Sequence, residues 1–214
     1  MPLIRGNFAM KPWAFVVALV IIAAVLCFCR DSSRATESAT PDSDAGEAEL
    51  MTASRPAYQA TTDPYIVVRK ADRRLELHSA TALLGTYRIA LGNSPVGSKI
   101  REGDGRTPEG RYYVCTKKFN SKYYRSLGIS YPGLNDAERG LRDKMITQKE
   151  FDDIRAAIED RVCPPWNTAL GGAVCIHGNG SSADWTLGCV AMDNADMDTL
   201  FERVAAGTDV IVMP

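Results

Sequence analysis

Apolar and polar positions divide the 214-residue chain into three unlike segments. The first contains 17 consecutive apolar residues, from Trp13 to Cys29, with no charge among them. As a helix this run would span about 26 Å, near the lower limit for crossing a bilayer. Arg5 and Lys11 precede it, and positive residues keep an N-terminus in the cytoplasm. We therefore expect residues 1–30 to form a signal anchor, with a cleaved signal peptide as the alternative, and the remainder to be extracytoplasmic, in the periplasm.

The second segment, residues 31–63, is polar and acidic. It has seven Asp or Glu against two Arg. Its large apolar side chains are Leu50, Met51 and Tyr58, too few to offset the chain entropy that ordering would cost. We expect a disordered acidic linker, so that residues 64–214 form the single folded domain of the chain.

In the third segment, alternating apolar and polar residues predict short strands. Leu75 and Leu77 alternate with Glu76 and His78 behind a polar turn, which is the pattern of a hairpin with the apolar run that ends at Val68. We expect strands at 66–68, 75–78, 87–91, 112–115, 173–177 and 210–212. The domain should therefore be mainly β.

Two stretches carry apolar residues at helical spacing instead. Thr147 and Glu150 form a capping-box pattern ahead of an apolar stripe that ends at Val162. A second stripe follows Asn194, an expected N-cap, and stops at Gly207. The first helix belongs to an insertion between strands, and the second comes shortly before the last strand.

Charge and cysteine content exclude several classes of protein. The net charge is −1, and about +1 in residues 64–214, which argues against a nucleic-acid partner because such proteins carry a basic domain or stripe. Six cysteines are too few for a disulfide scaffold. In an oxidising compartment one disulfide could form among Cys115, Cys163 and Cys175, with Cys163 as a favoured partner, and the sequence leaves the pair open.

The chain has two histidines that could supply imidazole chemistry. His78 falls on the polar side of an alternating strand and is expected to be an ordinary surface residue. His177 ends an apolar strand, and Cys189 follows it by twelve residues. A thiol becomes a useful nucleophile at neutral pH when a base lies nearby, and a glycine such as Gly188 leaves backbone N–H groups free to face an oxyanion.

Two other interpretations use the same residues. Cys189 could be a small, inert core residue beside a hydrogen-bonded histidine. A zinc site could combine His177 and Cys189 with Asp184 or Cys175, but the paired-ligand spacing that is typical of zinc sites is lacking. We expect neither a metal nor a cofactor.

Three short motifs follow one another along the third segment. They are Thr107-Pro108-Glu109-Gly110-Arg111-Tyr112, Ile176-His177-Gly178 and Thr186-x-Gly188-Cys189-Val190. Together they resemble the signature of the L,D-transpeptidases of the YkuD type, and the resemblance covers residues 64–213. From Gly188 to Met192 the chain reads G-C-V-A-M, which is similar to the YafK-like branch of that family.

The resemblance implies a β-sandwich-like catalytic domain with a helix after the nucleophile. It implies that Cys189 attacks a carbonyl of a peptidoglycan stem peptide, with His177 as the base and the Gly178 carbonyl orienting the imidazole. Backbone N–H groups of Gly188 and Cys189 would hold the oxyanion. A thioester would form, and an amine or water would resolve it.

Two positions depart from the usual pattern of the family. Ala191 stands where an arginine is usual, and Leu187 where a histidine is often found. These departures leave open a hydrolase that releases wall-attached peptides or proteins, an activity associated with the YafK-like branch. A sortase is disfavoured because its histidine lies much farther upstream, and a non-catalytic wall-binding module would leave Cys189 inert.

The insertion expected at residues 117–170 contains two helices and should flank the cleft. Within it, Tyr131 and Trp166 are candidates for substrate contact. For Trp166 a packing role is the favoured interpretation.

Overall fold

The computed structural model describes residues 64–214. The expected membrane segment at residues 13–29 and the expected linker at residues 31–63 lie outside the described residues. Within residues 64–214, none of the helices combines the length and the apolar character that crossing a membrane requires.

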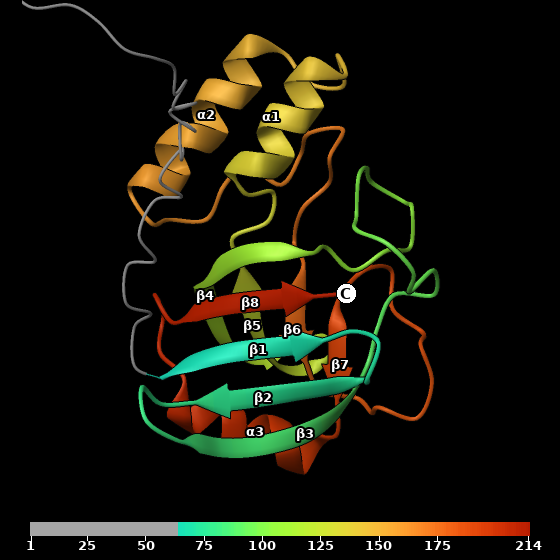
Figure 1. Ribbon diagram of the computed structural model, residues 1–214, viewed down its shortest axis with the longest axis vertical. Helices are drawn as coiled ribbons and strands as arrows, with labels where there is room; N and C mark the ends of the chain where they lie inside the picture. Colours follow the sequence, from blue (N-terminus) through green and yellow to red (C-terminus); the bar gives the residue numbers. More distant parts are fainter. Residues whose placement is uncertain (1–63) are drawn as a thin grey trace, which may run out of the picture. The chain divides into compact units, whose positions relative to one another are not determined.

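The described residues form a mainly β domain with three helices (Figure 1). Its strands are β1 (Tyr65–Arg69), β2 (Arg74–His78), β3 (Leu83–Ala90), β4 (Gly110–Ser121), β5 (Tyr124–Ile129), β6 (Cys175–His177), β7 (Val190–Met192) and β8 (Asp209–Met213). Its helices are α1 (Leu134–Arg142), α2 (Gln148–Glu159) and α3 (Asn194–Arg203). The strands close into a barrel in the order β1-β2-β3-β7-β6-β5-β4-β8.

The closed barrel differs from the expected sandwich because two long strands each serve both sheets. β3 pairs with β2 along most of its length, and then Ile89 and Ala90 pair with β7. β4 pairs with β8 from Gly110 to Tyr113 and with β5 from Val114 onward. A strand that continues from one sheet into the next leaves no open edge at that corner.

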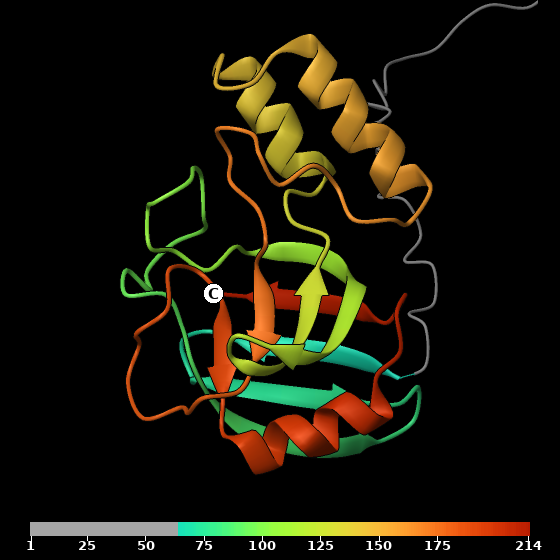
Figure 2. The ribbon, with the colours of Figure 1, turned by 180° about the vertical axis from the view of Figure 1, so that it is seen from behind.

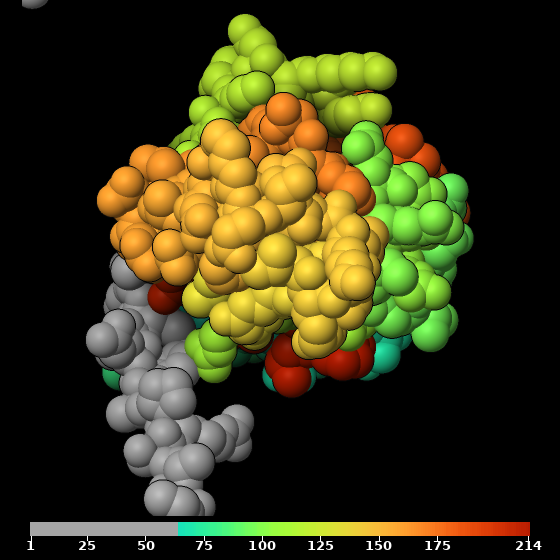
Figure 3. Space-filling view, turned by 90° about the horizontal axis from the view of Figure 1, so that it is seen from above, coloured from blue at the N-terminus to red at the C-terminus, as the bar shows by residue number. Residues whose placement is uncertain are grey.

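Apolar residues fill the barrel at the positions where the sequence alternates. β1 and β2 form the expected antiparallel hairpin, and Ile66, Val68, Leu75 and Leu77 are completely buried. The helix α3 covers the end of the barrel opposite to α1 and α2 (Figure 2). It contributes three buried side chains, Met197, Leu200 and Phe201. A smaller apolar cluster joins α1 to α2, and these two helices form one face of the domain (Figure 3).

Two strands lie where the sequence predicted none. β5 falls inside the expected insertion at 117–170, so the true insertion between β5 and β6 begins after Ile129. From Ser126 to Ile129 every residue of β5 is buried, which removes the alternation that marks a half-exposed strand. The second, β7, has three residues, all buried.

The expected helix boundaries are partly wrong. α2 begins at the predicted capping box, in which the Thr147 hydroxyl accepts from the Glu150 N–H, but it ends before Val162, which is 53% exposed. The N-cap position of α3 is Asp193 rather than its neighbour Asn194, and the helix ends at Val204, not at Gly207. Val204 is buried in an extended conformation, so core packing ends this helix one turn before the glycine.

A disulfide between Cys115 and Cys163 ties β4 to the segment that follows α2. Cys163 is thus a disulfide partner, as the sequence favoured, and Cys175 and Cys189 are free. The bridge spans 48 residues of chain and encloses both insertion helices.

Replacing both Cys115 and Cys163 by serine should lower the free energy of unfolding by about 2–4 kcal/mol, because opening a loop of this length enlarges the unfolded ensemble. Urea unfolding of the oxidised protein measures the difference. The Cys175→Ser variant, which changes a free thiol, is the control and should unfold near the wild-type midpoint. A double variant as stable as wild type would show that the bridge does not constrain the chain.

Candidate active site

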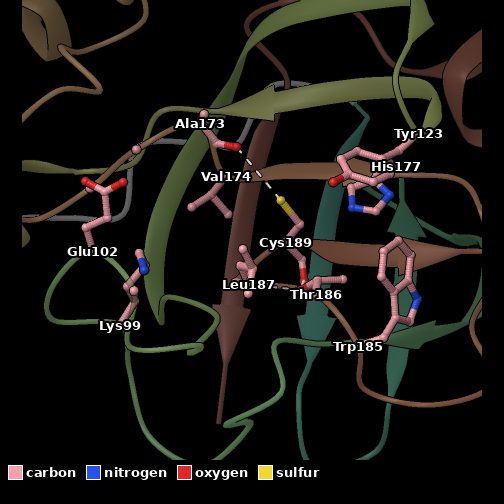
Figure 4. Close-up of a pocket in the computed structure, with 14 residues that line it drawn as sticks. Lys99, Glu102, Tyr123, Ala173, Val174, His177, Trp185, Thr186, Leu187 and Cys189 are labelled. Atoms are coloured by element: carbon pink, nitrogen blue, oxygen red, sulfur yellow. Dashed lines mark hydrogen bonds between the residues drawn. The ribbon is translucent and has the colours of Figure 1, made fainter.

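The candidate base lies on β6, and the candidate nucleophile directly precedes β7, the parallel neighbour of β6. In the β6–β7 pair, Ile176 lies opposite Val190 and His177 opposite Ala191. Cys189, directly before β7, therefore lies beside the start of β6, and Cys189 and His177 line one cavity (Figure 4). The structure brings together the two residues that the sequence paired.

The imidazole of His177 is fixed in place. It is 2% exposed, and its Nδ1 lies 2.7 Å from the carbonyl oxygen of Gly178. Because a carbonyl can only accept, Nδ1 carries the proton and Nε2 is left as the basic nitrogen. The ring stacks on Tyr123 with centroids 4.7 Å apart and meets the edge of Trp185 at 5.6 Å. Gly178 thus holds the tautomer that a base for Cys189 requires.

The surroundings of the Cys189 sulfur favour the thiolate. A hydrogen bond from the Cys175 thiol, together with the hydrogen bond of His177, the charge that His177 carries once Nε2 is protonated, and the Cys175 N–H, holds the pKa of the Cys189 thiol well below its usual range. Burial acts in the opposite direction and is outweighed. A cysteine of this kind is reactive at neutral pH.

Two threonines fix the backbone around Cys189. The Thr186 hydroxyl donates to the Cys189 carbonyl oxygen at 2.7 Å, and the Thr107 hydroxyl reaches the same oxygen at 3.5 Å. The Gly188 N–H donates to Thr186 Oγ1 at 3.1 Å, so the oxyanion donor expected from Gly188 is engaged within the loop. Gly188 has a φ of +137°, and a Cβ there would lie 2.7 Å from the Arg106 carbonyl oxygen, which explains the glycine before the nucleophile.

Two cavities, of about 350 and 310 Å³, reach the sulfur. Tyr123, Ala173, His177 and Cys189 line both. The first is also bordered by Lys99 and Glu102, from the loop between β3 and β4, and by the β6–β7 loop, as Figure 4 shows. The second is also bordered by Lys118, Asn120, Lys122 and Trp166. The two cavities therefore meet at the candidate nucleophile.

The two aromatic candidates for substrate contact differ in position. Tyr131 is completely buried, and its hydroxyl donates to the Leu170 carbonyl oxygen at 3.0 Å, so the expectation of substrate contact is corrected to a packing role. Trp166 lines the second cavity, and its buried indole N–H has no hydrogen-bond partner within residues 64–214.

Asp184, a candidate zinc ligand, and His78, the second histidine, form contacts away from Cys189. Asp184 forms an ion pair with Arg73 at 2.7 Å and accepts from the Leu91 N–H, which ties the β6–β7 loop to β3. In the described part of the chain, no three His, Cys, Asp or Glu side chains are grouped so as to hold a metal. His78 contacts Glu76 at 3.0 Å and lies outside both cavities.

No local sequence pattern indicates how the loop at residues 93–109 is held beside the site. Lys70, 1% exposed, donates to the carbonyl oxygens of Gly97 and Thr107 and to the Glu109 carboxylate, at 2.6, 3.0 and 2.7 Å. Thr107 in turn binds the Gly92 N–H and the nucleophile's carbonyl. Thr107 and Glu109 could have been found through their motif, whereas Lys70 lies in an ordinary polar turn.

Comparison with known proteins agrees with this geometry. The model of the L,D-transpeptidase catalytic domain (YkuD) matches residues 63–212. This match covers more than half of the chain, so the chain belongs to the L,D-transpeptidase family.

Among individual relatives, the chain is 26% identical over 201 residues to the Escherichia coli K12 protein described as "Putative L,D-transpeptidase YafK". The match covers 91% of this chain and 64% of that protein, so the chain spans less than two thirds of its relative. The cell-shape-determining protein Pgp2 of Campylobacter jejuni is 22% identical with a TM-score of 0.49, over 72% of this chain and 49% of that one. An L,D-transpeptidase of Xylanimonas cellulosilytica is 16% identical with a TM-score of 0.43, over 74% and 64% of the two chains.

Proposed function

We propose that this protein is an extracytoplasmic enzyme that transfers acyl groups of peptidoglycan stem peptides through a thioester on Cys189. One observation carries the proposal: the Cys189 thiol, with its pKa lowered, lies beside a histidine whose Nδ1 is fixed by the Gly178 carbonyl, at the junction of two open cavities. Membership of the L,D-transpeptidase family supports the substrate class.

The reaction would proceed in two halves. The Cys189 thiolate attacks the peptide carbonyl carbon, a C–S bond forms, and the oxyanion accepts a hydrogen bond from the Cys189 N–H. Collapse breaks the C–N bond, and the His177 imidazolium gives its proton to the leaving amine. An incoming amine or water then loses a proton to His177, attacks the thioester and returns the thiolate.

Hydrolysis is the second candidate, favoured by the two departures from the family pattern. Ala191 is completely buried opposite His177, so no guanidinium reaches the site from this position. Leu187 is 76% exposed at the cavity edge, where it provides no imidazole. Without these polar groups to hold an amine acceptor, water would resolve the thioester, and the substrate would be a peptide or protein attached to the wall. Attachment to the membrane through residues 13–29 would keep the enzyme near the wall.

The test is to incubate the full chain with soluble wall fragments that carry stem peptides, and to record intact mass and products. We expect a covalent adduct that peptide mapping places on Cys189, with cross-linked products if an amine resolves it and shortened peptides if water does. Protein blocked beforehand with iodoacetamide is the control. An adduct on another residue, or equal turnover by the blocked protein, would refute the proposal.

A further inference from the structure

A second free thiol lies against the proposed nucleophile. Because Ile176 and Val190 face each other in the parallel β6–β7 pair, the residues directly before them, Cys175 and Cys189, are cross-strand neighbours. Neighbouring strands lie about 4.8 Å apart, and residues in register direct their side chains to the same face. These two cysteines are the free cysteines of the described residues.

The contacts of Cys175 centre on the nucleophile and on one shared acceptor. Its backbone N–H donates to Cys189 Sγ at 3.4 Å. The Ala173 carbonyl oxygen lies 3.4 Å from the Cys175 sulfur and 3.8 Å from the Cys189 sulfur. The Ala173 oxygen is thus one acceptor for the Cys175 thiol, and the Cys189 sulfur, with which the Cys175 side chain shares a hydrogen bond, is the second.

We propose that Cys175 is a positioning residue, whose thiol donates a hydrogen bond to the Cys189 thiolate and keeps the nucleophile ionised between turnovers. The inference rests on the proposed role of Cys189. When Cys189 loses its proton to His177 Nε2, the Cys175 S–H turns from the Ala173 oxygen to the sulfur anion. Formation of the C–S bond removes the negative charge from the Cys189 sulfur, and the Cys175 S–H returns to the Ala173 oxygen. Cleavage of the thioester releases the thiolate, and the S–H turns to it again.

Energetics favour Cys189 as the thiolate and Cys175 as the protonated hydrogen-bond donor. Hydrogen bonds to a charged acceptor are roughly twice as strong as those between neutral groups, which offsets part of the penalty of burying an anion. The hydrogen bond to Cys189, followed by burial and the neighbouring charge, raises the pKa of the Cys175 thiol. Cys175 therefore stays protonated over the range in which Cys189 ionises, as a donor must.

Other titratable groups face the sulfur from the surrounding elements. Those that line the two cavities are Lys99, Glu102, Lys118, Lys122, Tyr123 and His177. They belong to the β3–β4 loop, β4, the β4–β5 turn and β6, and they are the same in any variant of Cys175. A difference between such variants therefore isolates the thiol donor.

The experiment compares the full-length wild type with the Cys175→Ala and Cys175→Ser variants. Iodoacetamide labelling of Cys189 is followed by peptide mass mapping between pH 5.5 and 9.5. Loss of one hydrogen bond to an anion should slow labelling of Cys175→Ala by about tenfold at pH 6, with wild-type rates at pH 9.5, where the thiolate forms in both proteins. Cys175→Ser keeps a donor and should restore most of the rate at pH 6.

Each other result is informative. Three results would overturn the role of Cys175 and leave the proposed function unaffected. They are a pH profile of Cys175→Ala that matches the wild type, a labelling rate of Cys175→Ala that is low at every pH, and a Cys175→Ser variant as slow as Cys175→Ala. If Cys189 of the wild type labels no faster at neutral pH than an ordinary thiol, both proposals fail.

Discussion

The Cys189→Ala variant is expected to lose acyl transfer by at least about 10⁴-fold, because the thioester forms on the Cys189 sulfur and the neighbouring Cys175 thiol, whose pKa is raised, stays protonated. The substitution removes one sulfur atom and leaves the backbone hydrogen bonds from Thr186 and Thr107 in place. Stability should therefore change little. The measurements are the initial rate of product release from wall fragments and the free energy of unfolding in urea.

Cys175→Ser is the matched control, because it alters the neighbouring thiol but keeps a hydrogen-bond donor. It should retain most of the wild-type rate at neutral pH. If Cys189→Ala worked within tenfold of the wild type, the carbonyl would have to be attacked by another group, and the proposed chemistry would be wrong.

The Lys70→Met variant is expected to lose about 3–5 kcal/mol of unfolding free energy, because it removes one partner of a buried ion pair. The Lys70 side chain is 2% exposed and the side chain of its partner Glu109 is 21% exposed, so the remaining carboxylate would be only partly hydrated. The carbonyl oxygens of Gly97 and Thr107 would lose their donor at the same time. Urea unfolding followed by circular dichroism measures the loss.

Lys149→Met is the control, because it makes the same Lys→Met change at an exposed position. Lys149 lies on α2, 82% exposed, and its ion pair with Asp153 is screened by water. This variant should unfold at nearly the wild-type midpoint. A Lys70→Met protein as stable as this control would show that Lys70 is dispensable for holding the loop at residues 93–109.

Local patterns in the sequence predicted several features of the domain. The Leu75–His78 alternation identified a strand of the first hairpin, and the Thr147 capping box identified the start of α2. The motifs around His177 and Cys189, through their resemblance to a family signature, indicated a pair, which the structure places on β6 and directly before β7. In each case the information lies within a few residues of chain, or in a motif with a fixed order.

Features that depend on distant segments could not be predicted in this way. Closure of the barrel requires β4 to pair with β8, almost a hundred residues later in the chain. The buried position of Tyr131 depends on Leu170, and the end of α3 is set by the packing of Val204 in the core. A lysine in a turn carries no local sign that it will be enclosed, as Lys70 is.

The Cys115–Cys163 disulfide also determines how many thiols of the domain react with a labelling reagent. In the oxidised protein, residues 64–214 offer two free thiols, Cys175 and Cys189. Bonds of this kind persist in oxidising compartments and are reduced in the cytosol, so a preparation from a reducing cytosol would offer four. The stoichiometry of labelling under denaturing conditions therefore reports which form of the protein has been purified, before any rate is compared.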